Sequence, residues 1–440
     1  MEIYSESGQY RLYQGNMLDM LDVIEPESVD SIVTDPPYEL NFMNKGWDNS
    51  GVAFRKETWE RCFRVLKSGG YLLAFGGSRT FHRIACAIED AGFEIRDTIM
   101  WVFGSGFPKS MNIGLAIDKK NGVESEVVGK TQAHGYSNIM IGGQYEKGNG
   151  EKYTDIKQAR NEWNGYGTQL KPAYEPVIVA RKPCEGTIVE NVLKHSVGCI
   201  NIDECRVPFE DTPNPATNPL YRQEHGYKHD RSKSMAENSV VKFSTSPSEK
   251  PISPLGRFPA NVILTYDDTD FDEVCGGFPN TNGDTRTSKP TYDKSIWGNG
   301  KSVMSNCLYN DSGSAARYFY CAKATRRDRD EGLERLSSKN VHPTVKPCDL
   351  MQYLVRLVTP RGGTVLDPFN GSGSTGKAVM YENRDRGADY KYIGIELTPE
   401  YLPIAKARIE YVCGLSEDEL GVEERRDDGT PRRPQQMSLF

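Results

Sequence analysis

The sequence predicts an α/β fold, and three observations lead to that prediction. Short β-branched or apolar runs at residues 29–34 and 69–77 are typical of buried strands in a parallel sheet. Between them, residues 54–66 place apolar side chains at helical spacing. The pattern returns near the C-terminus, where residues 364–367 and 392–396 again predict strands. Strands and helices therefore alternate at both ends of the chain.

The remaining helices follow from spacing and from a capping pattern. Residues 80–91 repeat the amphipathic helical spacing, and residues 350–358 place apolar side chains at i, i+3, i+4 and i+7. Thr398, Pro399 and Glu400 predict a helix start, with a capping hydroxyl, a proline at the first position and an acidic first turn. We expect this helix to follow the last predicted strand directly.

Two long stretches lack a sustained period. Residues 121–170 are polar and rich in glycine, and we expect them to form a surface excursion. Residues 177–180 then predict a strand. Residues 186–335 are irregular and rich in Pro, Asn, Asp and Ser. Because this stretch is too long for a loop, we expect it to form a separate domain.

Composition sets broad limits on the class of protein. The chain has 440 residues and ten cysteines, which suits two or three domains with free thiols. Apolar runs of membrane-spanning length and a basic-then-apolar leader are not seen in the sequence, so we expect a cytoplasmic protein. The net charge of -7 argues weakly against a nucleic-acid partner. Local charge differs, because residues 317–329 carry a net charge of +4 with aromatic residues between the basic ones.

A glycine-rich loop at residues 371–377 follows a predicted strand and precedes a helix. Its sequence fits a P-loop until Ala378, where the hydroxyl that binds Mg²⁺ should stand. It also fits G-x-G-x-x-G, with Glu396 about 20 residues beyond the last glycine, where a carboxylate could accept from ribose hydroxyls. A third interpretation is a glycine-rich turn that binds nothing.

The tetrapeptide Asp35-Pro36-Pro37-Tyr38 ends the predicted strand at residues 29–34. Its prolines lack amide hydrogens, so nearby carbonyl oxygens are available as acceptors. Asp35 and the Pro36 carbonyl could accept two hydrogens from the amino group of a planar ring, while Tyr38 stacks on that ring. The alternative is a rigid turn that happens to contain an aspartate.

Together, Asp35-Pro36-Pro37-Tyr38 and Asp367-Pro368-Phe369-Asn370-Gly371-Ser372-Gly373 resemble the motif pair of DNA amino-methyltransferases that use S-adenosylmethionine. The catalytic tetrapeptide precedes the cofactor loop, an order that resembles the circularly permuted β group. His342-Pro343-Thr344-Val345-Lys346-Pro347 resembles that group's additional cofactor-side motif. The sequence departs from the family at Asn16, where an aspartate usually contacts the cofactor adenine.

The resemblance implies a class I methyltransferase fold whose sheet is assembled from both ends of the chain. It implies a catalytic half at residues 1–185, a target-recognition domain at 186–335 and a cofactor-binding half at 336–413. The implied catalytic residues are Asp35, Pro36, Pro37 and Tyr38, and the implied cofactor-binding residues are Asn16, His342, Thr344, Lys346, Asp367, Phe369, Asn370, Gly371, Ser372, Gly373 and Glu396.

The activity implied is methylation of adenine at N6 in a base flipped out of double-stranded DNA, with no metal required. The closest alternative is N4 methylation of cytosine, and a more remote one is a P-loop nucleotide-binding protein. The candidate DNA contacts are Arg317, Lys323, Arg326, Arg327 and Arg329.

The polar tail at residues 414–440 ends in Gln436-Met437-Ser438-Leu439-Phe440, which resembles the peptides that bind bacterial sliding clamps. We therefore expect a sliding clamp as a second partner. The resemblance to the β group also makes a homodimer an expectation.

Overall fold

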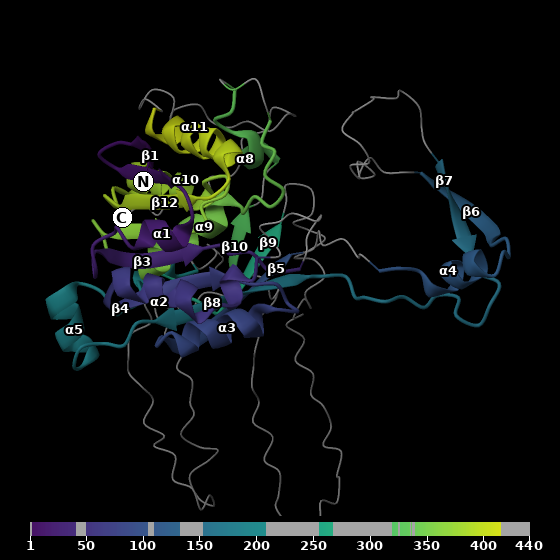
Figure 1. The fold of residues 1–440 in the computed structure, drawn as a ribbon, viewed down its shortest axis with the longest axis horizontal. Coiled ribbons are helices and arrows are strands. Elements are labelled where there is room, and N and C mark those ends of the chain that lie inside the picture. The colour runs from purple at the N-terminus through teal and green to yellow at the C-terminus, as the bar shows by residue number, and fades with distance from the viewer. Residues whose placement is uncertain are drawn as a thin grey trace, which may run out of the picture. The chain divides into compact units, whose positions relative to one another are not determined.

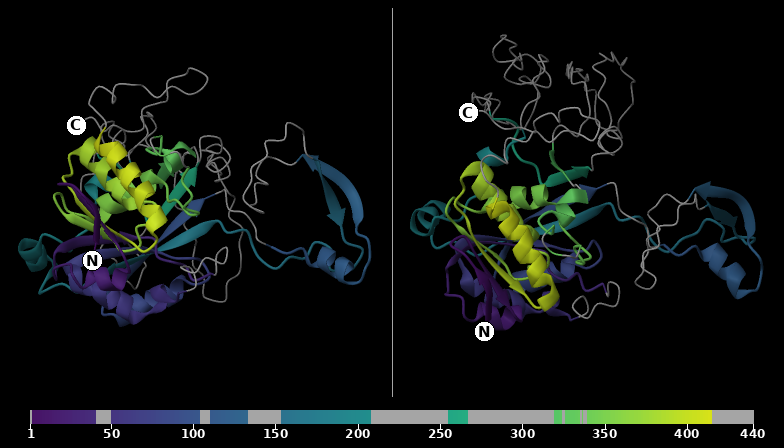
Figure 2. Two further views of the ribbon diagram at one scale, coloured as in Figure 1. Left: turned by 45° about the horizontal axis from the view of Figure 1, so that its top comes forward. Right: turned by 90° about the horizontal axis from the view of Figure 1, so that it is seen from above.

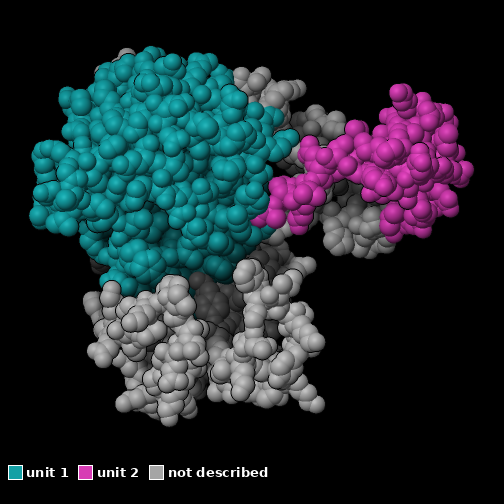
Figure 3. All heavy atoms as spheres, turned by 90° about the horizontal axis from the view of Figure 1, so that it is seen from below, with its two compact units in different colours: residues 1–104, 174–440 teal, residues 105–173 magenta. Residues whose placement is uncertain are grey.

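The computed structural model describes residues 2–40, 50–103, 110–132, 153–207, 255–266, 319–323, 326–334, 336 and 339–414. The chain divides into two compact units, and Figure 3 colours them separately. The larger unit comprises residues 1–104 and 174–440, and the smaller one comprises residues 105–173. None of the helices among the described residues has the length and apolar character needed to span a membrane.

The larger unit is built on a sheet that has ten strands within the described residues, in the order β1-β2-β12-β11-β3-β4-β8-β5-β9-β10 (Figure 1). β1 is antiparallel to β2, β8 is antiparallel to both β4 and β5, and the other neighbours run parallel. The strands are β1 (Glu2–Glu6), β2 (Tyr10–Gln14), β3 (Val29–Thr34), β4 (Leu66–Phe75), β5 (Glu94–Phe103), β8 (Tyr174–Arg181), β9 (Val262–Tyr266), β10 (Tyr320–Lys323), β11 (Thr364–Asp367) and β12 (Lys391–Glu396).

The two ends of the chain share this sheet, as the sequence predicts. β11 and β12 lie between β2 and β3, with Val365 opposite Ser31 and Ile393 opposite Arg11. A mainly parallel sheet with an antiparallel strand, here β8, inserted between two parallel ones is the class I methyltransferase fold. The predicted α/β class and its permuted assembly are therefore confirmed.

Helices cover both faces of the sheet, as the alternation along β4 requires. Tyr71, Leu73 and Phe75 pack into the apolar core with the C-terminal helices, whereas Leu72 and Ala74 pack with the N-terminal ones. Figure 2 shows the two groups on opposite sides. The N-terminal group is α1 (Met17–Leu21), α2 (Lys56–Val65) and α3 (Phe81–Asp90), with the short η3 (Val52–Phe54); the C-terminal group is α9 (Cys348–Val358), α10 (Ser374–Arg386) and α11 (Leu402–Cys413), with η6 (Pro399–Tyr401).

The smaller unit contains regular structure where the sequence suggested a polar excursion. It holds α4 (Ile113–Lys120) and a two-stranded antiparallel sheet of β6 (Glu126–Gln132) and β7 (Tyr153–Gln158). The buried Asp118 carboxylate accepts from Arg160 N at 2.9 Å and from Asn161 Nδ2 at 2.6 Å. Hydrogen bonds to a buried carboxylate, rather than a periodic apolar face, thus join this unit. That is why periodicity did not reveal it.

The described parts of the predicted target-recognition domain are few. They are α5 (Ile188–His195), η4 (Asp203–Cys205), β9, β10 and α8 (Arg326–Asp330). β9 and β10 extend the main sheet beyond β5. Residues 208–254 and 267–318 lie outside the described residues. A separate domain at 186–335 therefore stays a prediction.

Candidate active site

The two predicted motifs meet at one edge of the sheet. β12, β11 and β3 are parallel neighbours, so Glu396, Asp367 and the residues after Thr34 all lie at carboxyl ends of strands. The hydroxyl of Thr34 donates to Asp367 Oδ1 at 2.7 Å. This bond joins the strand that carries Asp35 directly to the strand that carries the glycine loop.

Three side chains gather around Asp35. The Tyr38 hydroxyl oxygen lies 2.9 Å from Asp35 Oδ1 and 2.8 Å from Glu175 Oε2. The Lys346 ammonium lies 2.8 Å from Asp35 Oδ2 and 3.2 Å from Glu175 Oε2, and it donates to the Tyr38 hydroxyl at 3.1 Å. The backbone turn fixed by Pro36 and Pro37 brings Asp35 and Tyr38 together. The result is a polar cluster in which one ammonium and one hydroxyl lie between two carboxylates.

Lys346 is buried within this cluster. Its side chain is 7% exposed, and its ammonium lies 5.0 Å from the ring centre of Phe75 and 5.8 Å from that of Trp101. Burial by itself lowers the pKa of Lys346, but the carboxylates of Asp35 and Glu175 outweigh it and raise that pKa. Lys346 therefore carries its charge at neutral pH. The structure places this residue, which the resemblance assigns to cofactor binding, against Asp35, the predicted catalytic aspartate.

Burial and the two nearby carboxylates also act on Tyr38. They raise its pKa well above 10, with burial as the larger effect. The hydroxyl therefore keeps its hydrogen at neutral pH and can donate it to a carboxylate.

The glycine loop is shaped for close backbone approach. Gly371 and Gly373 have φ of 52° and 75°, in the left-handed region. A Cβ on Gly371 would lie 2.9 Å from His342 Nε2, and one on Gly373 would lie 3.0 Å from Ala405. Both positions therefore require glycine, because of the left-handed backbone and because the loop packs tightly against His342 and Ala405.

Glu396 holds the start of the loop. Its Oε2 accepts from Gly371 N at 2.7 Å, and its Oε1 accepts from Thr398 N at 2.7 Å. Burial raises the pKa of Glu396, against the opposing effect of these backbone amides. Each carboxylate oxygen keeps a second lone pair. The loop and this carboxylate thus fit a ligand that carries adjacent hydroxyl groups, as the ribose of S-adenosylmethionine does.

Hydrogen bonds to Asp367 and Tyr392 hold the first residues of the loop. Asp367 accepts from the hydroxyl of Thr375 at 2.6 Å, and burial raises its pKa to about 6. The backbone N–H of Phe369 donates to Asp367 Oδ1 at 3.1 Å. Asn370 Oδ1 accepts from the Tyr392 hydroxyl at 2.8 Å. These bonds fix the loop backbone before any ligand arrives.

Beneath the loop, Ser372 and Lys377 are tied to buried charged groups. Arg408 Nη1 donates to the Ser372 carbonyl oxygen at 2.7 Å. The fully buried Lys377 ammonium lies 2.7 Å from Asp328 Oδ1 and 2.9 Å from Glu331 Oε2. A P-loop lysine has to reach the ligand's phosphates, whereas this ammonium is already paired inside the protein. The P-loop alternative is therefore not supported by the geometry.

The cofactor-side motif packs against the loop. His342 Nδ1 lies 3.1 Å from the Thr344 carbonyl oxygen, and its ring meets Tyr401 edge to face at 4.6 Å. Burial lowers the pKa of His342 to about 4. The imidazole is therefore neutral at pH 7. Asn16, at the end of β2, is exposed and caps α1 by accepting from Leu18 N at 3.0 Å.

The predicted DNA contacts are placed only in part. Lys323 belongs to β10, Arg326 and Arg327 belong to α8, and Arg317 lies outside the described residues, as does the Gln436–Phe440 tail peptide. Arg329 donates to the carbonyl oxygens of Asn340 at 2.9 Å and His342 at 2.6 Å. The structure thus places Arg329 where it supports the cofactor-side motif.

Family comparison agrees with this geometry. A family model described as DNA methylase, covering N6 and N4 methyltransferases, matches residues 29–407. The chain belongs to this DNA methylase family. The match spans both motifs and the region between them.

Curated relatives of the DNA methylase match over shorter stretches. The type II methyltransferase M.HindIII of Haemophilus influenzae is 24% identical over 33% of this chain and 37% of its own length. The DNA adenine methyltransferase YhdJ of Escherichia coli is 32% identical over 22% of this chain and 31% of its own length. The chain thus spans about a third of the length of these relatives. The solved PvuII DNA methyltransferase, described as cytosine-N4-specific, has a TM-score of 0.43 at 14% identity and covers 95% of this chain and 92% of its own.

Glu175 is a residue of this site in the methylase that no sequence motif predicts. Glu175 precedes the predicted strand at residues 177–180, and no motif includes it. β8 is antiparallel to β4, with Val177 opposite Phe75, so the first residues of β8 reach the carboxyl ends of the parallel strands. The direction of β8 was the missing information. A sequence pattern alone does not reveal strand direction.

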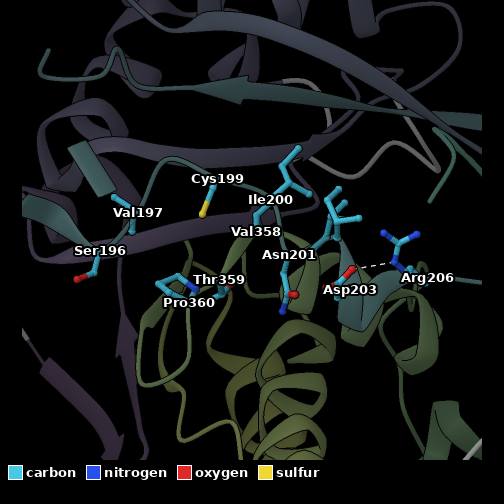
Figure 4. Close-up of a pocket in the computed structure, with 12 residues that line it drawn as sticks. Ser196, Val197, Cys199, Ile200, Asn201, Asp203, Arg206, Val358, Thr359 and Pro360 are labelled. Carbon is cyan, nitrogen blue, oxygen red and sulfur yellow. Dashed lines mark hydrogen bonds and ion pairs between the residues drawn. The ribbon is translucent and has the colours of Figure 1, made fainter. Parts of the chain in front are cut away.

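The methylase also has a pocket away from these motifs, with a volume of about 530 Å³. It lies between the residues that follow α5 and the C-terminal end of α9, and Figure 4 shows Cys199, Asn201 and Thr359 among its lining. Thr359 leads toward the amino end of β11, whereas Asp367 ends that strand. None of the described residues lining this pocket is a predicted catalytic or cofactor-binding residue.

Among the described residues, no group of three or more His, Cys, Asp or Glu side chains could hold a metal ion.

Proposed function

We propose that this DNA methylase transfers a methyl group from S-adenosylmethionine to N6 of an adenine base flipped out of double-stranded DNA. One observation gives the strongest support to this proposal. The acceptor-rich Asp35-Pro36-Pro37-Tyr38 turn and the glycine loop lie on neighbouring strands, joined by the bond from Thr34 to Asp367. This arrangement supports a site for an amino group beside a site for a nucleoside cofactor.

The chemistry requires activation of a weak nucleophile. The lone pair of an aromatic amine is delocalised into its ring, so the nitrogen attacks poorly. Hydrogen bonds from the amino group to Asp35 and to the Pro36 carbonyl oxygen would favour tetrahedral nitrogen and localise the lone pair. Bound S-adenosylmethionine supplies an electrophilic methyl group. Alignment and fixed acceptors then provide most of the rate enhancement.

The cofactor would be held by residues around the glycine loop. Glu396 is suited to accept from ribose hydroxyls, and Asn16 lies at the end of the adjacent strand β2. Gly371 and Gly373 allow close backbone approach. The His342 ring lies beside Gly371 and close to the Thr344 carbonyl oxygen, and Phe369 belongs to the loop. These assignments extend the family resemblance to the geometry described above.

DNA binding is part of the proposal. The base has to leave the helix to reach Asp35, which costs on the order of a few kcal/mol and is offset partly by stacking on Tyr38. The basic segment at residues 317–329 suits contact with phosphates. We assign target recognition to residues 186–335.

Adenine is favoured over cytosine as the target base. Asp as the first residue of the tetrapeptide favours adenine in the family, and YhdJ is named as a DNA adenine methyltransferase. Because cytosine presents a similar amino group, N4 methylation of cytosine is the competing function.

One experiment separates these functions. Purified protein and labelled S-adenosylmethionine are incubated with unmethylated DNA, and DNA from expressing cells is sequenced by a modification-aware method. We expect incorporation into DNA and N6-methyladenine at one recognition sequence. N4-methylcytosine would replace the adenine assignment, and incorporation into neither base would refute the proposed function.

A further inference from the structure

Glu175 belongs to the active-site cluster without belonging to either motif. It stands at the start of β8, and its Oε2 lies 2.8 Å from the Tyr38 hydroxyl oxygen. That oxygen is 2.9 Å from Asp35 Oδ1. Asp35, Tyr38 and Glu175 thus form a continuous chain of oxygen atoms at hydrogen-bond distances.

This series of three oxygen atoms has one hydrogen fewer than it needs for two hydrogen bonds. The Tyr38 hydroxyl has a single hydrogen and can donate it to Asp35 or to Glu175, but not to both. The Lys346 ammonium donates to the tyrosine oxygen and to each carboxylate, so it places no hydrogen between Tyr38 and either carboxylate. A proton added to Asp35 or Glu175 would complete the chain. The cluster is therefore arranged to accept one proton.

Methylation of an amino group releases one proton. When the nitrogen forms its bond to the methyl carbon it becomes positively charged, and it returns to neutrality by losing a hydrogen. We propose that Asp35, Tyr38 and Glu175 form a relay that takes this proton and holds it on Glu175. This inference rests on the proposed function and adds the destination of the proton.

The relay balances its protons. The N–H bond of the methylated amine breaks as an O–H bond forms on Asp35. Asp35 then passes this proton to the Tyr38 oxygen while the original Tyr38 hydrogen passes to Glu175 Oε2. At the end Asp35 is ionised again, Tyr38 is neutral and Glu175 is a neutral carboxylic acid.

The charges around the chain favour this direction. The groups facing Glu175 are Tyr38, Lys346 and, through Tyr38, Asp35. The ammonium lies closer to Asp35, at 2.8 Å, than to Glu175, at 3.2 Å, so it stabilises ionised Asp35 more strongly. The Glu175 side chain is also 25% exposed, which lets it return the proton to water.

The test uses Glu175→Gln, which keeps the size of the side chain and cannot accept the proton. We expect the single-turnover rate of methyl incorporation into DNA to fall by on the order of 10²-fold. Affinities for S-adenosylmethionine and for DNA, measured by calorimetry, should be unchanged. The control is Glu94→Gln, which removes a carboxylate paired with Arg181 at the other end of the β5 and β8 pair and should leave the rate unchanged. An unaltered rate for Glu175→Gln would overturn the relay.

A second variant separates proton acceptance from structural support. Glu175→Ala leaves space for a small carboxylate, so added formate should raise its rate, and chloride at equal ionic strength should not. Equal effects of formate and chloride would assign Glu175 a structural role and overturn the inference. If the unaltered protein transfers no methyl group to DNA, the proposed function fails and the relay fails with it. If the unaltered protein methylates DNA and the Glu175 variants do so at the same rate, the relay fails and the proposed function stands.

Discussion

The neutral state of His342 should make folding sensitive to acid. Its pKa falls from the ordinary 6.5 to about 4 because burial beside the glycine loop disfavours the imidazolium. Since folding lowers this pKa, protonation favours the unfolded chain. The contribution of His342 to stability is complete above about pH 6.5 and is lost as pH falls toward 4. At 1.36 kcal/mol per pH unit, the loss approaches about 3 kcal/mol at pH 4.

The assay is urea unfolding of the unaltered protein and of His342→Gln at several pH values from 7 to 4. The substitution removes the titrating group, while other titrating groups such as Asp367 stay common to both proteins. The free energy of unfolding of the unaltered protein should fall relative to the variant by about 3 kcal/mol across this range. His82→Gln, which changes an exposed histidine on α3, is the control and should follow the unaltered protein. Parallel curves for His342→Gln and the unaltered protein would refute the reasoning.

Three further predictions concern binding and catalysis. Asp35→Ala should abolish methyl transfer while calorimetry still detects cofactor binding, and equal loss of both would remove the catalytic role. Glu396→Ala should weaken cofactor binding by roughly 10- to 150-fold, since a charge-assisted hydrogen bond contributes about 1.5–3 kcal/mol; an unchanged affinity would show that the carboxylate serves only the loop backbone. A peptide ending in Gln436–Phe440 should bind a bacterial sliding clamp saturably, and a scrambled peptide should not; no difference between them would end that prediction.

Local patterns were enough to predict the elements that carry the two motifs. The strand expected at residues 29–34 matches β3 (Val29–Thr34), because a β-branched run that ends in two prolines has few alternatives. The strand expected at residues 364–367 matches β11 equally well. Both strands are buried at the centre of the sheet. Buried strands require apolar side chains, so an apolar run in the sequence indicates them directly.

Features that depend on distant contacts were not predictable in this way. Lys346 lies in a motif predicted to bind the cofactor, yet its ammonium lies between Asp35 and Glu175, residues far away in the chain. The ion pairs of Lys377 with Asp328 and Glu331 likewise join segments about 50 residues apart. A sequence pattern reports which face of an element is apolar. It does not report which charged groups meet when elements pack.

The position of β11 and β12 also has a consequence for folding during protein synthesis. β2 and β3 are made within the first 34 residues, but the strands that fill the space between them are made only when residues 364–396 emerge. Pairings across such a sequence distance form late and slowly. During synthesis β2 and β3 therefore each keep one edge without its partner strand. A chaperone that shields these edges would aid folding. The candidate active site can assemble only after residues 186–335, proposed to recognise DNA, have already been synthesised.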